Sequence, residues 1–421
     1  MPRSEPIKAA RGVRDVLPAA IPLWRKAELG AAEVAKKFGY QEIATPVIEQ
    51  LELIQRVGEE TDTVAKELYR LEKRGSQNLA LRPEATAGVV RAYFEGALNQ
   101  GPQPTRLYLI GPMFRHDKPQ KGRYRQFSQF NVEVIGGANP GFDAEVIELA
   151  NGWLNEVGLK ALRLELNSIG DARCRPAYLE RLKDYYRPLK PQLHEDSQLR
   201  LERNPLRLLD SKLPFEQQFK ADAPKITDHL CDECAAHWVA VRHLLDSANI
   251  SYQVNPYLVR GLDYYTRTVF EFYPGDASGQ QDALASGGRY DGLAEAEGWP
   301  STPGVGFAGG IDRVVELMAA SGRESVERPA AEVVVLPDGD LSVEAAEVAR
   351  ICRRVRSTAV DYEVRKFPTK MKLAEKLGAK WVVIMTPGQA ARRLVRLRDV
   401  ASGDEVEVSW EQIPTRLGAE A

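Results

Sequence analysis

The sequence predicts a mixed α+β protein, in which an antiparallel-sheet domain precedes a smaller α/β domain. Two strand patterns, at 107–115 and 125–135, flank a polar loop and predict an antiparallel hairpin. Residues 171–256 have a charged, helical pattern, which indicates a helical insertion. From 331 to 421 strand and helix patterns alternate, as in a compact α/β module. The first domain is therefore expected over residues 1–325, and the second over 331–421.

Local signals define the elements before the hairpin. Residues 22–38 repeat apolar side chains at helical spacing, and Gly39 ends this helix. An extended run follows at 40–49 and contains Pro46, which suits an edge strand or an interface. A second helix is expected over 83–98, with a proline in its first turn.

The elements after the insertion follow from the same signals. A strand at 268–273 leads through glycine-rich turns to an apolar helix at 311–320. The polar stretch 321–329 has the composition of a linker. In the C-terminal module we expect strands at 333–336, 362–367 and 381–385 and helices near 343–356 and 369–377.

Composition excludes several classes of protein. The 421 residues include 57 basic and 59 acidic side chains, so the formal charge is 57 − 59 = −2, and any contact with nucleic acid must come from local patches. Four cysteines are too few for a disulfide framework and suit a reducing compartment. The apolar runs are too short to cross a bilayer, and the N-terminal residues carry no apolar signal segment. A cytoplasmic location without membrane contact is expected.

The second hairpin strand carries the first candidate site. Alternate residues share a face of a strand, so Gln129 and Glu133 point the same way, away from Phe130 and Val132. That face either lines a pocket that holds both ends of a small polar metabolite or is solvated. Arg115 precedes a basic loop, which either binds phosphate or is a solvated charged loop.

Several longer motifs occur together in this sequence. They are Gly111–Phe127, Phe38–Pro46, Gly304–Arg313, Leu258–Thr266 and Ser286–Gly292, with Arg11-Gly12, Asp15 and Leu17-Pro18 near the N-terminus. The first three resemble motifs two, one and three of the class II aminoacyl-tRNA synthetases. The next two resemble the histidine-specific signatures of the histidyl-tRNA synthetase family. The C-terminal module resembles that family's anticodon-binding domain, so the resemblance covers essentially the whole chain.

The resemblance implies a role for each matching residue. Arg115 and Arg260 would be the catalytic cations, Arg260 standing where other class II members use a metal or another cation. The residues implied to bind histidine are Glu84, Thr86, Arg115, Gln129, Glu133, Arg260, Tyr264 and Tyr265. Those implied to bind ATP are Arg115, Arg123 and Arg313, and those implied to contact the tRNA acceptor end are Lys118, Gln120 and Lys121. Asp117 stands where the family commonly has glutamate, which puts the adenine-side contact in doubt.

The implied activity is that of a homodimeric histidine–tRNA ligase. Its substrates would be L-histidine, ATP accompanied by Mg²⁺, and the tRNA for histidine. The alternative is a non-catalytic paralogue, the regulatory subunit of ATP phosphoribosyltransferase, which typically lacks the anticodon-binding domain and parts of the arginine signatures. A module that only binds RNA or senses uncharged tRNA is a second alternative, but it would need neither Glu84 nor the phosphate-binding arginines.

Two short patterns suggest other chemistry. Cys231-x-x-Cys234, with three histidines nearby, raises a zinc site, but no second cysteine pair exists, and we expect no dedicated metal site. The glycines of Gly304-x-Gly306-x-x-Gly309 match a dinucleotide fingerprint, but no apolar strand precedes them. These glycines are expected instead to let the backbone approach a nucleotide.

Overall fold

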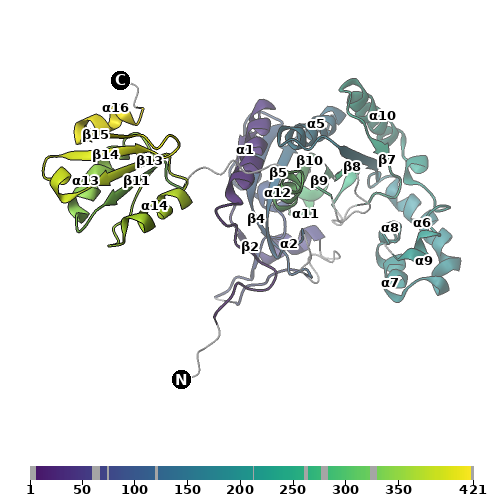
Figure 1. Cartoon of the computed structure of the whole chain (residues 1–421). Helices are drawn as coiled ribbons and strands as arrows, with labels where there is room; N and C mark the ends of the chain where they lie inside the picture. Colours follow the sequence, from purple (N-terminus) through teal and green to yellow (C-terminus); the bar gives the residue numbers. More distant parts are fainter. Residues whose placement is uncertain are drawn as a thin grey trace. The chain divides into compact units, whose positions relative to one another are not determined.

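A computed structural model describes residues 6–58, 67–73, 75–118, 122–211, 213–259, 264–275, 283–322 and 330–418. The chain divides into two compact units, Met1–Ser325 and Val326–Ala421. Each unit has its own sheet and its own apolar core (Figure 1). No helix among the described residues is both long and apolar enough to cross a membrane.

A large, mainly antiparallel sheet forms the centre of the first unit. In spatial order its strands are β1 (Gln41–Glu42), β4 (Thr105–Phe114), β5 (Gln126–Ile135), β10 (Gly304–Gly310), β9 (Ala285–Arg289), β8 (Thr266–Pro274), β6 (Leu162–Ser168) and β7 (Gln253–Val254). The two edge strands pair in parallel with their neighbours, and the inner pairs are antiparallel. The expected class, α+β with an antiparallel sheet and a separate α/β module, is confirmed.

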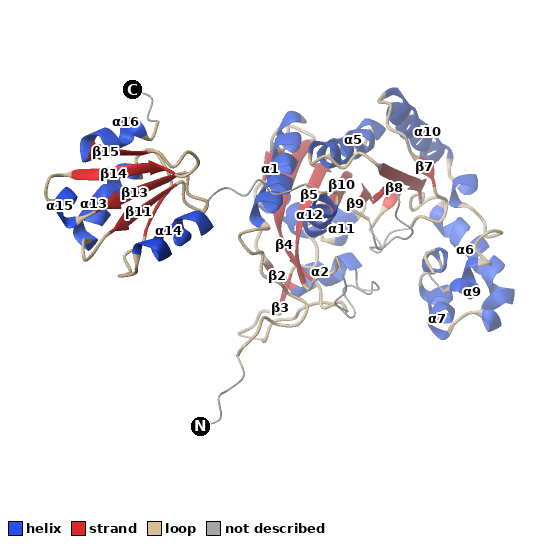
Figure 2. Cartoon of the chain, viewed as in Figure 1, coloured by secondary structure: helices blue, strands red, loops and turns tan. Residues whose placement is uncertain are grey.

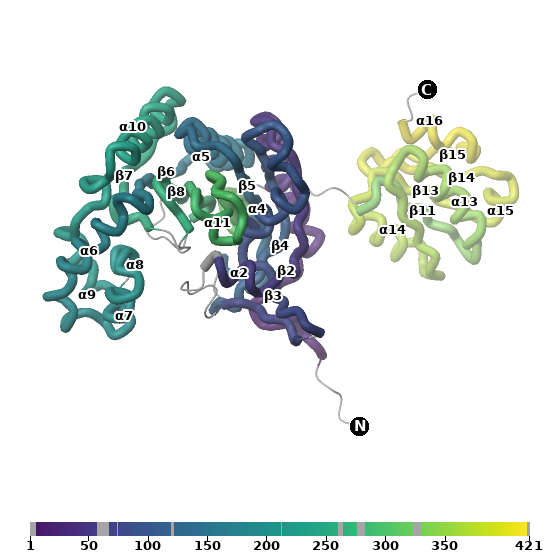
Figure 3. The backbone as a smooth tube through the Cα atoms, turned by 180° about the vertical axis from the view of Figure 1, so that it is seen from behind, coloured from purple at the N-terminus to yellow at the C-terminus, as the bar shows by residue number. Residues whose placement is uncertain are grey.

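Helices cover this sheet, and a small sheet lies beside it. The helices are α1 (Ile21–Lys37), α2 (Leu51–Gly58), α4 (Thr86–Glu95), α5 (Pro140–Glu156), α11 (Leu293–Ala296) and α12 (Ile311–Ala320), and the small sheet pairs β2 (Ile48–Gln50) with β3 (Leu79–Leu81). α1, α5 and α12 pack with the sheet in the largest apolar core, around Phe130, Trp153 and Phe307. Seen from behind, α4 and α11 lie in front of the sheet (Figure 3).

The expected hairpin is present as β4 and β5, with register pairs from Thr105↔Ile135 to Phe114↔Gln126. The helix expected at 311–320 coincides with α12. The extended run at 40–49 is divided instead, because β1 joins the large sheet whereas β2, after Pro46, pairs with β3.

The insertion is helical, as the charged pattern indicates. Its elements are α6 (Arg175–Tyr186), η2 (Arg187–Gln192), α7 (Glu195–Arg203), α8 (Leu206–Leu209), α9 (Pro214–Gln217), η3 (Ile226–His229) and α10 (Asp232–Ser247). Tyr178, Leu182 and Tyr186 of α6 build a separate core there with Leu201 and Leu209. The insertion therefore has apolar packing of its own.

The sequence predicted only turns where β9 lies, because Ser286-Gly-Gly has low strand propensity. The glycines are required by the neighbouring strands. A Cβ on Gly287 would lie 2.6 Å from the Cβ of Phe307, and one on Gly288 would lie 3.0 Å from a ring carbon of Tyr265. Close approach of three backbones therefore selects glycine in a central strand.

The second unit is an α/β module (Figure 2). Its strands, in spatial order, are β12 (Thr358–Val360), β11 (Val333–Pro337), β13 (Trp381–Met385), β14 (Leu394–Asp399) and β15 (Glu405–Ser409). Its helices are α13 (Ser342–Cys352), α14 (Phe367–Lys376), α15 (Pro387–Ala390) and α16 (Ile413–Arg416), and it also contains the short 3-10 helix η5 (Trp410–Gln412). A short helix of the same kind in the first unit is η1 (Leu98–Gln100). The strand expected at 362–367 was wrong. β12 takes its place beside β11, whereas Tyr362 and Val364 are exposed and bury no apolar face.

Candidate active site

A cavity of about 310 Å³ lies where the β4–β5 hairpin, β9, β10 and the start of α4 meet. This volume is at the lower end of the range for small-molecule sites, about 300–1,000 Å³. Eight residues that the sequence singled out line it: Glu84, Thr86, Arg115, Arg123, Gln129, Tyr264, Tyr265 and Arg313. They come from segments up to 229 positions apart, since 313 − 84 = 229, and the sheet brings them together.

Other candidates lie elsewhere. Glu133 is buried behind the cavity wall, and Lys118 is on the hairpin loop without lining the cavity. Gln120, Lys121 and Arg260 lie outside the described residues.

Part of the cavity lining consists of hydrogen-bond acceptors. Gln129 pairs with Gly111 on one side and Gly310 on the other, so its side chain has no bulky neighbour across either strand. Its Oε1 atom is buried and has no hydrogen-bond partner among the described residues. Burying an amide oxygen without a hydrogen-bond donor destabilises the folded state, and a ligand N–H group can supply the missing hydrogen bond.

Glu84 is fixed at the positive end of α4. Its carboxylate accepts hydrogen bonds from the backbone N–H groups of Thr86 (2.6 Å) and Ala87 (3.1 Å). Burial raises the pKa of Glu84, and these backbone donors oppose the shift. The start of α4 therefore holds the Glu84 carboxyl at the cavity wall, where the backbone N–H groups favour its ionised form.

Glu133 does not line the cavity itself but is hydrogen-bonded to two residues that do. The Thr86 hydroxyl donates to one carboxylate oxygen (2.8 Å), and the Tyr290 hydroxyl donates to the other. Both hydroxyl-bearing residues line the cavity. Burial raises the pKa of Glu133 to about 8, while the two hydroxyl donors lower it only in part. Glu133 can therefore gain or lose a proton near neutral pH.

Cationic side chains also line the cavity. Arg115 follows β4 and is oriented by a hydrogen bond from Nε to the Pro83 carbonyl (2.9 Å). Arg313, at the start of α12, donates to the carbonyls of Gly122 (3.1 Å) and Ala283 (2.7 Å). These contacts fix each guanidinium before a ligand binds, as phosphate recognition favours.

The departure at Asp117 has a structural consequence. Asp117 lines the cavity and forms an ion pair with Arg123, with 2.8 Å between Nη1 and Oδ2. Asp117, whose side chain is shorter than the glutamate common in the family, thus holds Arg123 at the base of the hairpin loop.

Two tyrosines form an aromatic side of the cavity. The rings of Tyr264 and Tyr265 are 4.8 Å apart between centroids, and Tyr264 lies 6.0 Å from Tyr290. Burial raises the pKa of Tyr264 and of Tyr290 well above the ordinary value, so both hydroxyls stay protonated and can donate. The sequence assigned no role to Tyr290, although it lies inside the Ser286–Gly292 signature.

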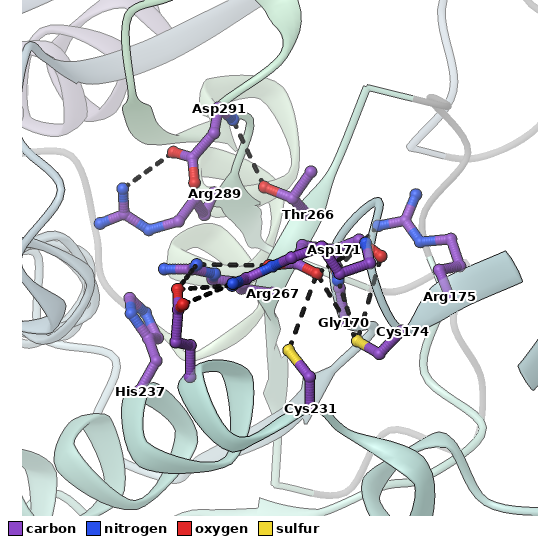
Figure 4. A network of polar contacts seen from close by, with 12 residues as sticks. Gly170, Asp171, Cys174, Arg175, Cys231, His237, Thr266, Arg267, Arg289 and Asp291 are labelled. Carbon is purple, nitrogen blue, oxygen red and sulfur yellow. Dashed lines mark hydrogen bonds and ion pairs between the residues drawn. The ribbon is translucent and has the colours of Figure 1, made fainter. Parts of the chain in front are cut away.

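A buried ion-pair network supports β9 from behind. Arg289 is fully buried, pairs with Asp143 and donates to the Gly137 carbonyl (2.9 Å). It also donates to Asp291 (3.0 Å) (Figure 4). His237 of α10 lies 3.1 Å from Asp143. The Arg289 guanidinium and His237 hold the pKa of Asp143 below its ordinary value despite burial.

The glycines of β10 make room for side chains. A Cβ on Gly304 would overlap the Tyr290 ring, one on Gly306 would overlap the Glu133 carboxylate, and one on Gly309 would overlap Trp153. Gly306 also lines the cavity. The dinucleotide-like spacing therefore reflects packing inside a central strand.

Comparison with known proteins agrees with this geometry. The family model described as "Histidyl-tRNA synthetase" matches residues 12–174 and 198–314, and the one described as "Anticodon binding domain" matches residues 332–420. A histidine–tRNA ligase of Desulforudis audaxviator is 44% identical over 419 residues, which is 99% of this chain and 99% of the relative. One of Anaeromyxobacter dehalogenans is 43% identical and covers 98% and 99%.

Solved structures give the same picture. The apo histidyl-tRNA synthetase of S. aureus is 33% identical, with a TM-score of 0.81 over 98% of this chain and 99% of that one. A structure described as an ATP phosphoribosyltransferase regulatory subunit/histidyl-tRNA synthetase from Bacillus halodurans C is 23% identical, with a TM-score of 0.64 over 91% and 99%. At that identity the second similarity concerns the fold alone.

Proposed function

The chain belongs to the histidyl-tRNA synthetase family, and we propose that its cavity joins L-histidine to ATP and that histidine then passes to the 3′ end of a tRNA. The chain is a class II histidine–tRNA ligase, since curated ligases match it over nearly its full length at 42–44% identity. The regulatory-subunit alternative has less support, because this chain includes a match to the anticodon-binding domain.

One observation carries the assignment of residues. A single cavity is lined both by acceptors, Glu84 and the Oε1 of Gln129, which has no partner among the described residues, and by cations, Arg115 and Arg313. An amino acid has an ammonium group for the acceptors and a carboxylate for the cations. ATP adds phosphates, which also require cations. We place histidine among these groups, with its ring beside Tyr264.

The chemistry follows from this placement. A carboxylate oxygen of histidine attacks the α-phosphorus of ATP, a new O–P bond forms, and the bond to pyrophosphate breaks. Two anions approach each other in this step, so Arg115 lowers the barrier by balancing charge at the reacting atoms. Arg313 and Arg123 hold the remainder of the nucleotide. Arg260 belongs to the same proposal through the family motif alone.

The remaining assignments are part of the proposal. Mg²⁺ would arrive with ATP, since it binds chiefly through phosphates. The hairpin loop, with Lys118, Gln120 and Lys121, would contact the acceptor end of tRNA, and residues 331–421 would bind the anticodon. A homodimer and a cytoplasmic location rest on the family resemblance.

Pyrophosphate exchange tests the proposal. The full chain should exchange labelled pyrophosphate into ATP with histidine and with no other amino acid. Arg115→Ala should reduce exchange by at least about 100-fold, as loss of a transition-state charge contact does. Arg125→Ala is the matched control, because Arg125 lies on the same hairpin without lining the cavity. Absence of exchange from the folded wild-type chain would contradict the ligase assignment, and normal exchange by Arg115→Ala would remove Arg115 from the mechanism.

A further inference from the structure

A second chemical cluster lies outside the cavity, at the base of the helical insertion. Asp171 and Cys174 lie between β6 and α6, and Cys231 lies at the start of α10 (Figure 4). Cys234 lies in the first turn of α10. One oxygen of Asp171 and the three Sγ atoms lie within 4.8 Å of one another. Three of the four cysteines of the chain meet here, although 60 positions separate Asp171 from Cys231.

We propose that these four side chains bind one Zn²⁺ ion. Zinc favours four ligands, and thiolates with a carboxylate are among its usual donors. In a tetrahedral zinc site an oxygen and a sulfur ligand lie about 3.5 Å apart. Here Oδ1 of Asp171 lies 3.7 Å from the Sγ of Cys174 and 3.9 Å from the Sγ of Cys231. Two thiolates on one zinc lie about 3.8 Å apart, and the four ligand atoms here lie within 4.8 Å of one another, so shifts of up to about one ångström would complete the coordination.

The two oxygens of Asp171 have different surroundings. Oδ1 faces the sulfur atoms, whereas Oδ2 pairs with Arg173 (3.1 Å) and Arg267 (3.3 Å). Three thiolates and one carboxylate around Zn²⁺ carry a net charge of −2. The two guanidinium groups offset part of that charge, because both also pair with Glu233, whose carboxylate adds one negative charge. The free oxygen of the carboxylate is thus held as zinc ligands usually are, by a second layer of hydrogen bonds.

The surrounding backbone suits thiolate ligands. Cys174 and Cys231 are the N-cap residues of α6 and α10, where the helix dipole stabilises negative charge. Cys174 and Cys234 are buried, while Cys231 and Asp171 are half-buried, which leaves one side open for metal entry. Gly170 has a positive φ of 63°, and a Cβ there would lie 2.7 Å from the Sγ of Cys174. Glycine therefore preserves space around this sulfur.

The site has a structural consequence. Zinc would join the beginning of the insertion, at Asp171 and Cys174, to its last helix at Cys231 and Cys234. Arg175, the residue after Cys174, donates to the backbone carbonyl of Tyr265 (2.6 Å), at the edge of the active-site cavity. The ion would therefore hold the insertion against the strand that carries part of the histidine pocket. The sequence alone argued against a metal because it shows no second cysteine pair, whereas in the structure Asp171 and Cys174 lie where such a pair would be needed.

Metal content of the full-length chain tests the proposal. The protein is purified in reductant without chelator, and zinc is measured by mass spectrometry. Wild type and Cys352→Ser, which changes the remaining cysteine, should each carry one zinc per chain. Cys231→Ser, at a half-buried ligand, should carry less than about one-fifth of that amount. Cobalt uptake should give a thiolate-to-metal charge-transfer band in wild type and Cys352→Ser that Cys231→Ser lacks.

Variants of Asp171 test the fourth ligand without depending on a loss of folding. Asp171→Cys should slow zinc transfer to a chelator by at least about tenfold, because a thiolate replaces a carboxylate, whereas Asp171→Asn should speed it. Equal transfer rates from wild type and both variants would overturn the four-ligand site. Wild-type protein that neither retains zinc nor takes up added Zn²⁺ or Co²⁺ would overturn the proposal, as would a native disulfide among the three thiols.

Discussion

Glu133 should make histidine affinity depend on pH, and Glu133→Gln should abolish that dependence. Burial raises the pKa of this carboxyl to about 8, so it is mainly protonated at pH 7. Histidine brings a positive ammonium group and donates from its ring, and both favour the ionised carboxylate. The ionised fraction rises from about one-tenth at pH 7 to about three-quarters at pH 8.5, so the Kd for histidine should fall about eightfold over that range.

The substitution keeps the neighbouring contacts. A glutamine oxygen can still accept from Thr86 (2.8 Å to the native oxygen), and its amide can donate to the Tyr290 hydroxyl. Removing the charge at Glu133 should weaken the hydrogen bonds from Thr86 and Tyr290 and the attraction to bound histidine, by about 1.5–3 kcal/mol where the native carboxylate is ionised. Ionising Glu133 at pH 7 costs the wild type about 1.4 kcal/mol of this gain. The variant should therefore bind histidine about 1- to 15-fold more weakly than wild type at pH 7, and at least about tenfold more weakly at pH 8.5.

Calorimetric titration at both pH values provides the measurement. The imidazole of free histidine is mainly neutral over this range, since a pKa of about 6.5 leaves about a quarter of it protonated at pH 7 and about 1% at pH 8.5. ATP titration is the internal control and should change little in the variant. Glu297→Gln is the matched control, because it removes another buried carboxyl with a raised pKa that does not line the cavity. The same pH dependence in wild type and Glu133→Gln would refute the reasoning, and equal losses of histidine and ATP affinity would assign Glu133 to the fold.

Two further predictions concern stability and packing. Burial raises the pKa of Glu297 to about 9, and neither oxygen has a hydrogen-bond partner among the described residues, so the carboxyl destabilises the folded state as pH rises from about 4.3 toward 9. Glu297→Gln should therefore raise the free energy of unfolding in urea by about 1–3 kcal/mol at pH 8 and little at pH 4.5. The control Glu295→Gln, at an exposed position, should leave the free energy of unfolding unchanged at both pH values. Equal effects of Glu297→Gln at both pH values would contradict the raised pKa. Gly306→Ala should reduce histidine affinity more than ATP affinity and destabilise the fold by about 1–3 kcal/mol, because its Cβ would overlap the Glu133 carboxylate and the Val132 carbonyl. Gly292→Ala is the control, because no atom lies within 4 Å of a Cβ at that position. Normal histidine binding by Gly306→Ala would contradict the close contact between Gly306 and the Glu133 carboxylate.

Sequence reasoning identified many local features of this protein. Alternation along 125–135 placed Gln129 and Glu133 on one face; in the structure Gln129 lines the cavity and Glu133 contacts residues that line it, whereas Phe130 and Val132 pack in the core. The hairpin and α12 were predictable because apolar periodicity reports which face of an element is buried. β9 was not, since its glycines show strand preference only when flanked by β8 and β10.

The sequence by itself determined which residue types stand at which motif positions, and therefore the family and the chemistry to expect. Only the tertiary structure decided how they interact. Glu133 acquires its raised pKa from burial and from contact with Tyr290, 157 positions away. Asp171 and Cys174 meet Cys231 and Cys234 because β6 and α10 bring both ends of the insertion together. Periodicity and spacing act over a few residues, whereas desolvation and ligand geometry depend on atoms that only the folded chain places within reach.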